Sequence, residues 1–285
     1  MAKLLKGAPV ASAMTETLRE KSENLRKNGV IPTLAIVRVG EKPEDLAYER
    51  GAEKRMALCG IAVRKLLLDN SAGTEEILSV IEECNRDTSV HGILLFLPLP
   101  KTVDEAAIVN AIAPEKDVDG VTMRSMACVY AGRGEGFAPC TAEAVVTLLK
   151  AYEIPLSGAR VTVVGRSLVI GKPVSLLLMR ENATVTVCHT KTKDLAGCCR
   201  EADILVAAAG KRELIGESCL SNGQTVVDVG IHTDENGNLC GDVESGAAER
   251  ICLARTPVPG GVGSMTTTVL ASHVLLAAER SYTER

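Results

Sequence analysis

The chain has no tryptophan, and aromatic residues make up only 2% of its 285 residues. Proteins that stack single-stranded bases need aromatic side chains, so this class is disfavoured. The formal net charge of −4 also lacks the basic field of a nucleic-acid binder. No apolar run reaches the length that spans a bilayer. These absences favour an ordinary globular protein that binds neither nucleic acid nor membrane.

The ten cysteines never form a C-x-x-C pair. We therefore predict neither a zinc site nor a thioredoxin-like redox site, and no metal site is expected. The N-terminal stretch 1–7 lacks the apolar core and cleavage pattern of a secretory leader. Scattered thiols without a disulfide framework indicate a reducing compartment. The expected location is the cytoplasm.

Apolar runs rich in β-branched residues alternate with helix-like segments along the chain. Strands are predicted over 32–39, 61–68, 90–97, 160–164, 183–187, 204–208 and 224–229. Helices are predicted over 9–28, 44–59, 74–86, 141–152, 174–179 and 266–279. Such alternation is typical of a mostly parallel sheet covered by helices on both faces. The expected fold class is α/β.

A loop-rich stretch from Pro114 to Pro139 carries four glycines and predicts a hinge between two domains. The length of 285 residues is enough for two modest domains. We expect residues 1–138 to form one parallel α/β domain and residues 139–265 to form a Rossmann-like nucleotide-binding domain. A last helix within 266–285 is expected to return to the first domain.

The most informative local motif is the turn after the predicted strand 160–164. Gly165 ends a β-branched run, Ser167 follows it, and Gly171 precedes a helix-like segment. Gly165 permits a tight turn, and Gly171 lets the helix pack close to the strand. This layout holds a dinucleotide pyrophosphate at a helix N-terminus in many α/β proteins. Because the spacing is G-x-S-x-x-x-G rather than G-x-G-x-x-G, an ordinary strand-to-helix turn is the competing interpretation.

The end of strand 183–187 favours NADP over NAD. NAD-selective sites usually place an acid at the end of the second strand, where it binds the ribose 2′-hydroxyl. Here the strand leads into His189, Thr190 and Lys191, and no carboxylate comes before Asp194. This neutral or cationic end, with Arg166 in the glycine turn, suits a 2′-phosphate. The alternative is that Arg166 and Lys191 are only solvated surface charges, and NAD stays open.

Further motifs occur in one order along the chain. They are Lys116-Asp-Val-Asp-Gly120, Pro139-Cys-Thr141, Gly165-Arg-Ser167 with Gly171-Lys-Pro173, Asp228-Val-Gly-Ile231, Gly241-Asp-Val243 and Thr256-Pro-Val-Pro-Gly-Gly-Val-Gly-Ser-Met-Thr266. Together they resemble the methylenetetrahydrofolate dehydrogenase/cyclohydrolase family of one-carbon metabolism, over almost the whole chain. The resemblance implies a folate-binding catalytic domain, an NADP-binding domain, a cleft between them and a homodimer. It also implies oxidation of 5,10-methylenetetrahydrofolate with NADP, followed in most members by hydrolysis to 10-formyltetrahydrofolate.

The resemblance also assigns site residues by motif position. Tyr48 and Asp119 would be the catalytic residues, with Tyr48 beside the folate rings and Asp119 bonded to the pterin. The implied contacts to tetrahydrofolate derivatives are Tyr48, Leu97, Asp119, Pro259, Gly260 and Gly261. The implied cofactor contacts are Gly165, Arg166, Ser167, Thr190 and Ile231. Without the resemblance, Asp119 would be interpreted as a turn-forming Asp before Gly120.

Two departures from the family pattern affect the second activity. The family has Y-x-x-x-K with a lysine central to the cyclohydrolase step, but Ala52 stands four residues after Tyr48. The family also has Gln before L-P-L-P, where this chain has Phe96. Lys54 and Arg50 lie on other sides of the predicted helix. We therefore predict a dehydrogenase with weak or no cyclohydrolase activity, because water activation needs a polar group near the reacting carbon.

Two other interpretations stay open. One is the full bifunctional enzyme, with Lys54 or another group recruited to the hydrolysis. The other is a catalytically silent protein that binds NADP or folate. Ser264, where the family has Pro, and His273, where it has Asn, are smaller departures.

Overall fold

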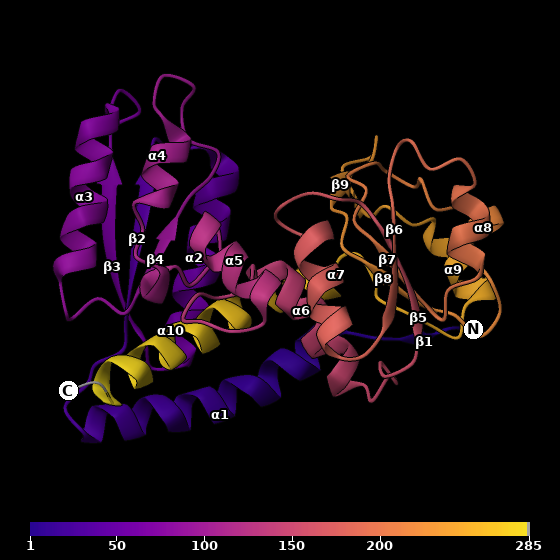
Figure 1. The fold of residues 1–285 in the computed structure, drawn as a ribbon, viewed down its shortest axis with the longest axis horizontal. Helices are drawn as coiled ribbons and strands as arrows, with labels where there is room; N and C mark the ends of the chain where they lie inside the picture. Colours follow the sequence, from indigo (N-terminus) through magenta and orange to yellow (C-terminus); the bar gives the residue numbers. More distant parts are fainter. Residues whose placement is uncertain (284–285) are drawn as a thin grey trace. The chain divides into compact units, whose positions relative to one another are not determined.

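A computed structural model describes residues 1–283. These residues form two compact units, each with its own parallel sheet (Figure 1). The three-stranded unit contains Ala13–Cys140 and the chain from Thr267 onward, and the six-stranded unit contains Met1–Ser12 and Thr141–Thr266. Residues 284–285 of the expected C-terminal segment lie outside the described residues.

The first twelve residues cluster with the six-stranded unit, whereas the sequence-based boundary grouped them with residues 13–138. The reason is a short strand, β1 (Lys3–Leu4), that pairs in parallel with β11 (Ala254–Arg255). Such a pairing between distant two-residue segments leaves no periodic signal in the sequence.

The three-stranded unit is a parallel sheet in the order β3-β2-β4. Its strands are β2 (Thr33–Val39), β3 (Ala62–Leu68) and β4 (Gly92–Leu95). The helices are α1 (Gly7–Lys27), which begins in the other unit, α2 (Pro43–Leu58), α3 (Thr74–Arg86), α4 (Glu105–Asn110), α5 (Met123–Ala131) and α10 (Thr266–Thr283). Helices α1 and α10 lie side by side in Figure 1, where Lys21 and Glu279 approach to 3.8 Å. The last helix thus returns to this unit, as predicted.

The loop-rich stretch from Pro114 to Pro139 contains a helix that the sequence did not predict. Helix α5 begins after Thr122, whose hydroxyl accepts the N–H of Ser125 at 3.0 Å, and ends at Gly132 with φ of 69°. A side-chain cap and a left-handed glycine stabilise the ends of such a short helix. The stretch predicted to be loop-rich thus contains one helix of nine residues.

The six-stranded unit is a parallel sheet in the order β1-β11-β8-β7-β5-β6. Its longer strands are β5 (Arg160–Val164), β6 (Thr184–Cys188), β7 (Ile204–Ala207) and β8 (Thr225–Asp228). The helices are α6 (Cys140–Ala151), which begins in the other unit, α7 (Gly171–Arg180), α8 (Leu195–Arg200) and α9 (Ser245–Ile251). A separate antiparallel hairpin joins β9 (His232–Thr233) to β10 (Leu239–Cys240).

The strand order of this unit changes direction between β5 and β7, because β6 lies on one side of β5 and the later strands lie on the other. Open α/β sheets bind ligands at such a switch point, beyond the carboxyl ends of the strands. The prediction of a parallel α/β fold is confirmed. No helix in the described part of the chain combines the length and apolar character needed to cross a bilayer.

Candidate functional site

The glycine turn lies at the carboxyl end of β5, as predicted. Gly165 has φ of 136°, a value that side chains rarely tolerate, and a Cβ there would overlap the carbonyl of Ala208. A Cβ on Gly171 would overlap the backbone of Gly165. Ser167 Oγ accepts the N–H groups of Ile170 and Gly171 at 3.2 and 3.4 Å, just before and at the first residue of α7. The glycines therefore form a closely packed cradle at a helix N-terminus.

The segment that follows β6 lies beside this turn. The N–H of Gly165 donates to the carbonyl of Cys188 at 2.9 Å. Arg166, Thr190 and Lys191 are all exposed on these two adjacent loops. The structure thus brings the four predicted cofactor residues Gly165, Arg166, Ser167 and Thr190 to one edge of the sheet. An exposed guanidinium with no acid at the strand end suits a phosphate group.

Ile231 is the remaining predicted residue of the cofactor set. It lines a cavity of 290 Å³ in the same unit. The cavity is bounded by Asp228–Ile231 and by Pro257–Ser264, which includes Pro259, Gly260 and Gly261. Ile231 is 63% exposed, although it is a large apolar residue. Ser264 closes this loop by donating its hydroxyl to the carbonyl of Gly261 at 2.7 Å. A flat ring could cover the apolar wall that Ile231 presents.

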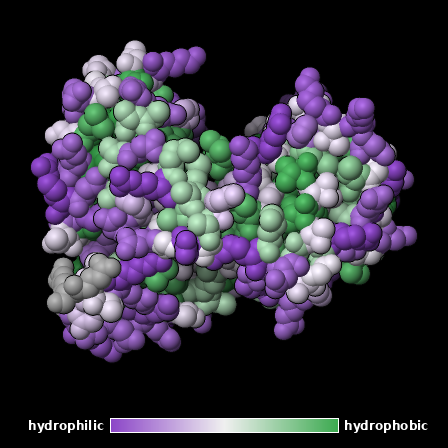
Figure 2. Space-filling model, in the orientation of Figure 1, coloured by the Kyte–Doolittle hydropathy of each residue, from purple (hydrophilic) through white to green (hydrophobic). Residues whose placement is uncertain are grey.

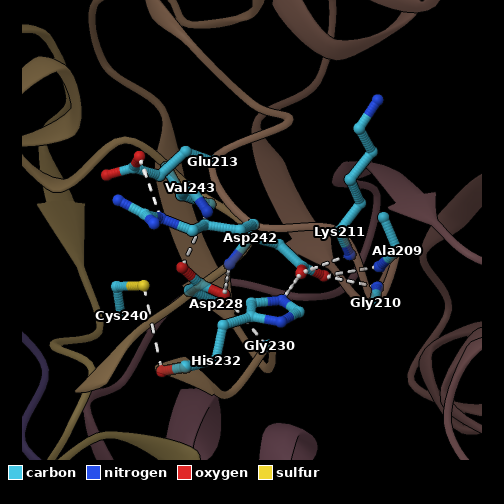
Figure 3. A network of polar contacts seen from close by, with 11 residues as sticks. Ala209, Gly210, Lys211, Glu213, Asp228, Gly230, His232, Cys240, Asp242 and Val243 are labelled. Atoms are coloured by element: carbon cyan, nitrogen blue, oxygen red, sulfur yellow. Dashed lines mark hydrogen bonds and ion pairs between the residues drawn. The ribbon is translucent and has the colours of Figure 1, made fainter. Parts of the chain in front are cut away.

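A network of two buried carboxylates supports this cavity (Figure 3). Asp228 accepts the N–H groups of Gly230, Asp242 and Val243 at 3.0, 3.0 and 2.9 Å. Burial raises the pKa of Asp228 to about 6, and the three backbone donors limit the rise. Asp228 therefore fixes the backbone at Gly230, next to Ile231, and at Asp242 and Val243 beyond the hairpin.

In the three-stranded unit, Tyr48 on α2 meets Phe96, which directly follows β4. The two rings are 5.8 Å apart between centroids, with planes at 70°. Ala52 is fully buried on α2, whereas Lys54 and Arg50 are exposed. The expectation that Lys54 and Arg50 point away from position 52 is confirmed. Leu97, another predicted substrate contact, is half-buried directly after Phe96.

A buried ion pair lies on the strand face next to Phe96. The N–H of Phe96 donates to the carbonyl of Val37, so residue 96 lies beside Arg38. Arg38 Nε donates to Glu49 Oε2 at 2.7 Å, and its guanidinium also donates to the carbonyl of Gly40. Burial alone would raise the pKa of Glu49, but Arg38 and Lys65 lower it below the ordinary value. Arg38 is thus hydrogen-bonded to two groups of its own unit, Glu49 and the carbonyl of Gly40.

Asp119 lies in a polar cluster with Cys140 and His273. Burial raises the pKa of Asp119 to about 6, while hydrogen bonds from Cys140 limit the rise. His273 is buried on α10, where its Nδ1 donates to the carbonyl of Val118 at 2.8 Å. Its ring also packs on Phe137 with centroids 4.8 Å apart. His273, where the family has Asn, thus holds the backbone carbonyl of Val118, the residue before Asp119.

The sequence analysis missed the Arg38–Glu49 pair, Cys140, His232 and Asp242 as parts of the site. One signal was available: Arg38 interrupts an otherwise apolar strand, and a buried arginine requires a partner. No sequence signal links His232 to Asp242 or His273 to Val118, because these partners meet only in the folded chain. Within residues 1–283 no group of three or more His, Cys, Asp or Glu side chains could hold a metal ion.

Comparison with known proteins identifies the family. The catalytic-domain model of the tetrahydrofolate dehydrogenase/cyclohydrolase family matches residues 5–119, and its NAD(P)-binding-domain model matches residues 139–282. The bifunctional protein FolD of Clostridioides difficile is 49% identical, with 97% of this chain and 96% of the relative aligned. FolD of Carboxydothermus hydrogenoformans is 47% identical over 98% of both chains.

Solved structures give the same result. The bifunctional FolD dehydrogenase/cyclohydrolase of Campylobacter jejuni has a TM-score of 0.95 and 38% identity, covering 98% of this chain and 99% of its own. The Trypanosoma brucei FolD, solved with NADP and an inhibitor, has a TM-score of 0.91 and 34% identity, covering 99% and 98%. This chain belongs to the tetrahydrofolate dehydrogenase/cyclohydrolase family.

Proposed function

We propose that this chain oxidises 5,10-methylenetetrahydrofolate to 5,10-methenyltetrahydrofolate by hydride transfer to NADP, with little or no cyclohydrolase activity. Membership of the family supports the dehydrogenase reaction, and both family domains are present. The observation that carries the second half is the apolar contact between Tyr48 and Phe96 beside a buried Ala52.

On this proposal Asp119 binds the pterin. Asp119 is half-buried, and the hydrogen bonds that its carboxyl accepts from Cys140 hold it in one orientation. A carboxylate there suits the amino and ring N–H donors of a pterin. Tyr48 and Leu97 would contact the folate ring system, since both side chains are only half-buried.

The residues of the six-stranded unit fit NADP. The backbone packs too closely at Gly165 and Gly171 to admit a Cβ, so the turn runs directly into the N-terminus of α7, where a phosphate would bind. Arg166 and Thr190 would bind the 2′-phosphate, and Ile231 with Pro259, Gly260 and Gly261 would border the nicotinamide. NADP supplies the hydride acceptor, and the chain orients the two reactants.

Hydride loss from the methylene carbon is assisted by the adjacent folate nitrogens, so the enzyme needs no strong general base for this step. Hydrolysis of the methenyl cation is different, because a polar group must activate water within hydrogen-bond reach. Ala52 has no polar atom, and Phe96 is packed against Tyr48. Arg38, the buried charged residue beside Phe96 in the sheet, is bound to Glu49 and to the carbonyl of Gly40.

The proposal is tested with the purified chain in two assays. NADPH formation from methylenetetrahydrofolate, measured by absorbance and repeated with NAD, tests the dehydrogenase and its coenzyme. Decay of the methenyl cation's absorbance tests the cyclohydrolase. Enzyme-dependent decay well above the buffer rate contradicts the loss of hydrolysis and supports the bifunctional alternative. That alternative is favoured by the relatives themselves, which carry the name bifunctional. No NADPH formation would indicate a silent binding protein.

We also propose a homodimer, with strand β6 as the contact. β6 is the edge of the six-stranded sheet, and Val187 on it is 42% exposed. Hydrophobic residues reach the surface in the region of β6 and α7 in Figure 2, where Met179 is 56% exposed. Exposed edges of this kind pair readily with a second strand. Sedimentation of the Val187→Lys variant should give monomers if this edge forms the dimer.

The proposed compartment is the cytoplasm. All ten cysteines are free thiols, as a reducing compartment would keep them.

A further inference from the structure

The side chain of Asp242 is completely buried and receives four hydrogen bonds (Figure 3). Its Oδ2 accepts the N–H groups of Ala209 and Gly210 at 2.6 and 3.0 Å. Its Oδ1 accepts the N–H of Lys211 at 3.0 Å and contacts Nε2 of His232 at 2.7 Å. Three backbone N–H groups donate to the two oxygens of this carboxylate. A carboxylate oxygen accepts, so Nε2 of His232 is the donor toward Asp242 in this contact.

These bonds join two separate segments of the six-stranded unit. Residues 209–211 follow β7 at the switch point of the sheet, directly after Ala208, whose carbonyl lies against Gly165. His232 begins the β9–β10 hairpin and directly follows Ile231. Asp242 lies just beyond the hairpin, after Gly241. One carboxylate thus ties the loop after β7 to the residue that presents Ile231 to the cavity.

We propose that His232 is a positioning residue for the nicotinamide end of the cofactor. Its hydrogen bond to Asp242 anchors the residue next to Ile231 to the same carboxylate that binds the loop 209–211, before the cofactor binds. The inference rests on the proposed use of NADP, and it adds a residue that does not itself contact the cofactor. Pre-organised binding loops lose less entropy when a ligand is bound. Breaking the bond should therefore weaken NADP binding more than it slows the hydride step.

Two substitutions separate the hydrogen bond from the bulk of the ring. His232→Ala removes the donor. His232→Gln keeps an amide N–H₂ at about the reach of Nε2, so it can still donate to Asp242. Glu235→Gln is the matched control, since Glu235 is exposed at the tip of the same hairpin. Thermal unfolding of all three variants shows whether the fold is retained.

The measurements are NADP binding by titration calorimetry on the full chain, and the KM values for NADP and folate. We expect His232→Ala to raise both the Kd and the KM for NADP about tenfold, from the loss of one charge-assisted bond. The folate KM and kcat should change less than twofold on the same reasoning. His232→Gln should restore most of the NADP affinity, and Glu235→Gln should match the wild type.

The outcomes distinguish this inference from the proposed function. If the wild type binds no NADP, the cofactor assignment fails and the inference fails with it. If the wild type binds NADP and folded His232→Ala binds it equally well, only the positioning role is wrong. An equal loss in the Ala and Gln variants also overturns it, because the donor would then not be the determinant. A fall in kcat without a change in NADP affinity contradicts it as well.

Discussion

The ring of Phe96 meets the ring of Tyr48 edge-on, with centroids 5.8 Å apart and planes at 70°. Edge-to-face geometry places the positive edge of one ring against the negative face of the other and stabilises both positions. Ala52 is buried on α2, and its own side chain has no polar atom. The side chains of Ala52 and Phe96 need no hydrogen-bond partner, so neither position leaves a buried polar group unsatisfied.

The first prediction is that cyclohydrolase activity can be restored. The double variant Ala52→Lys with Phe96→Gln should hydrolyse the methenyl cation at least about tenfold faster than the wild type, within the usual effect of an added acid–base group. The readout is decay of the cation's absorbance. Lys54→Ala is the control and should leave the residual rate unchanged, since Lys54 is exposed. A folded double variant without gain would show that the loss lies elsewhere.

The second prediction concerns Asp119, whose pKa rises from the ordinary 3.8 to about 6 in the folded chain. The folded state then binds more protons than the unfolded state between these two values. The contribution to stability is complete below pH 3.8 and is lost as the pH rises through 6. Asp119→Asn should therefore stabilise the chain at pH 8 by about 1 to 2 kcal/mol, and the gain should disappear near pH 4.

The same substitution should raise the folate KM about tenfold or more, because a charge-assisted acceptor for the pterin is lost. Unfolding temperatures at pH 8 and pH 4, with KM values at pH 8, check both halves. Asp234→Asn is the control. Asp234 lies in the β9–β10 hairpin, and the N–H groups of Asn238 and Asn236 that donate to its carboxylate lower its pKa. If Asp119→Asn is less stable than the wild type at pH 8, burial is not the dominant effect on this carboxyl.

The third prediction concerns the Arg38–Glu49 pair, whose side chains are 4% and 7% exposed. Glu49→Gln leaves a buried guanidinium without its counter-charge and should destabilise the chain by about 3 kcal/mol. The double variant Arg38→Met with Glu49→Leu should lose much less, because no charge stays buried. Urea unfolding of the three proteins measures this. Equal losses in both variants would mean that packing, and not charge, determines the stability here.

The pH dependence of this pair has the opposite sign to that of Asp119. The pKa of Glu49 is lowered in the folded chain. Its contribution to stability is therefore present above the unfolded value of 4.5 and is lost as the pH falls through the lower folded value. The double variant should lack this acid-sensitive component.

Periodic apolar segments were predictable, and partners brought together by folding were not. Strands such as β2 and β5 stand out because buried parallel strands are continuous β-branched runs. The turn at Gly165 could be placed because only glycine fits its backbone. By contrast, β1 and β11 are two residues each and lie at opposite ends of the chain. Their pairing depends on the whole sheet.

The site divides in the same way. Ala52 and Phe96 depart from a sequence motif, and the loss of two polar side chains at these positions is a property of the sequence alone. His273 showed no role in the sequence, because its contacts Val118 and Phe137 come from a different part of the chain. The role of a buried histidine depends on the group that it binds, and here that group is a carbonyl brought near only by the tertiary structure.

The fourth prediction addresses coenzyme choice. Arg166 is exposed in the glycine turn, beside the loop that carries Thr190. Arg166→Ala should raise the KM for NADP about tenfold or more and leave the KM for NAD nearly unchanged, because only NADP carries the 2′-phosphate. Lys191 is an exposed cation on the same loop as Thr190. Lys191→Ala tests whether any positive charge near the turn contributes equally to NADP binding. Steady-state rates with both coenzymes give the ratio. An equal loss with NADP and NAD would assign Arg166 to the pyrophosphate that both coenzymes share, and the 2′-phosphate would then need another ligand.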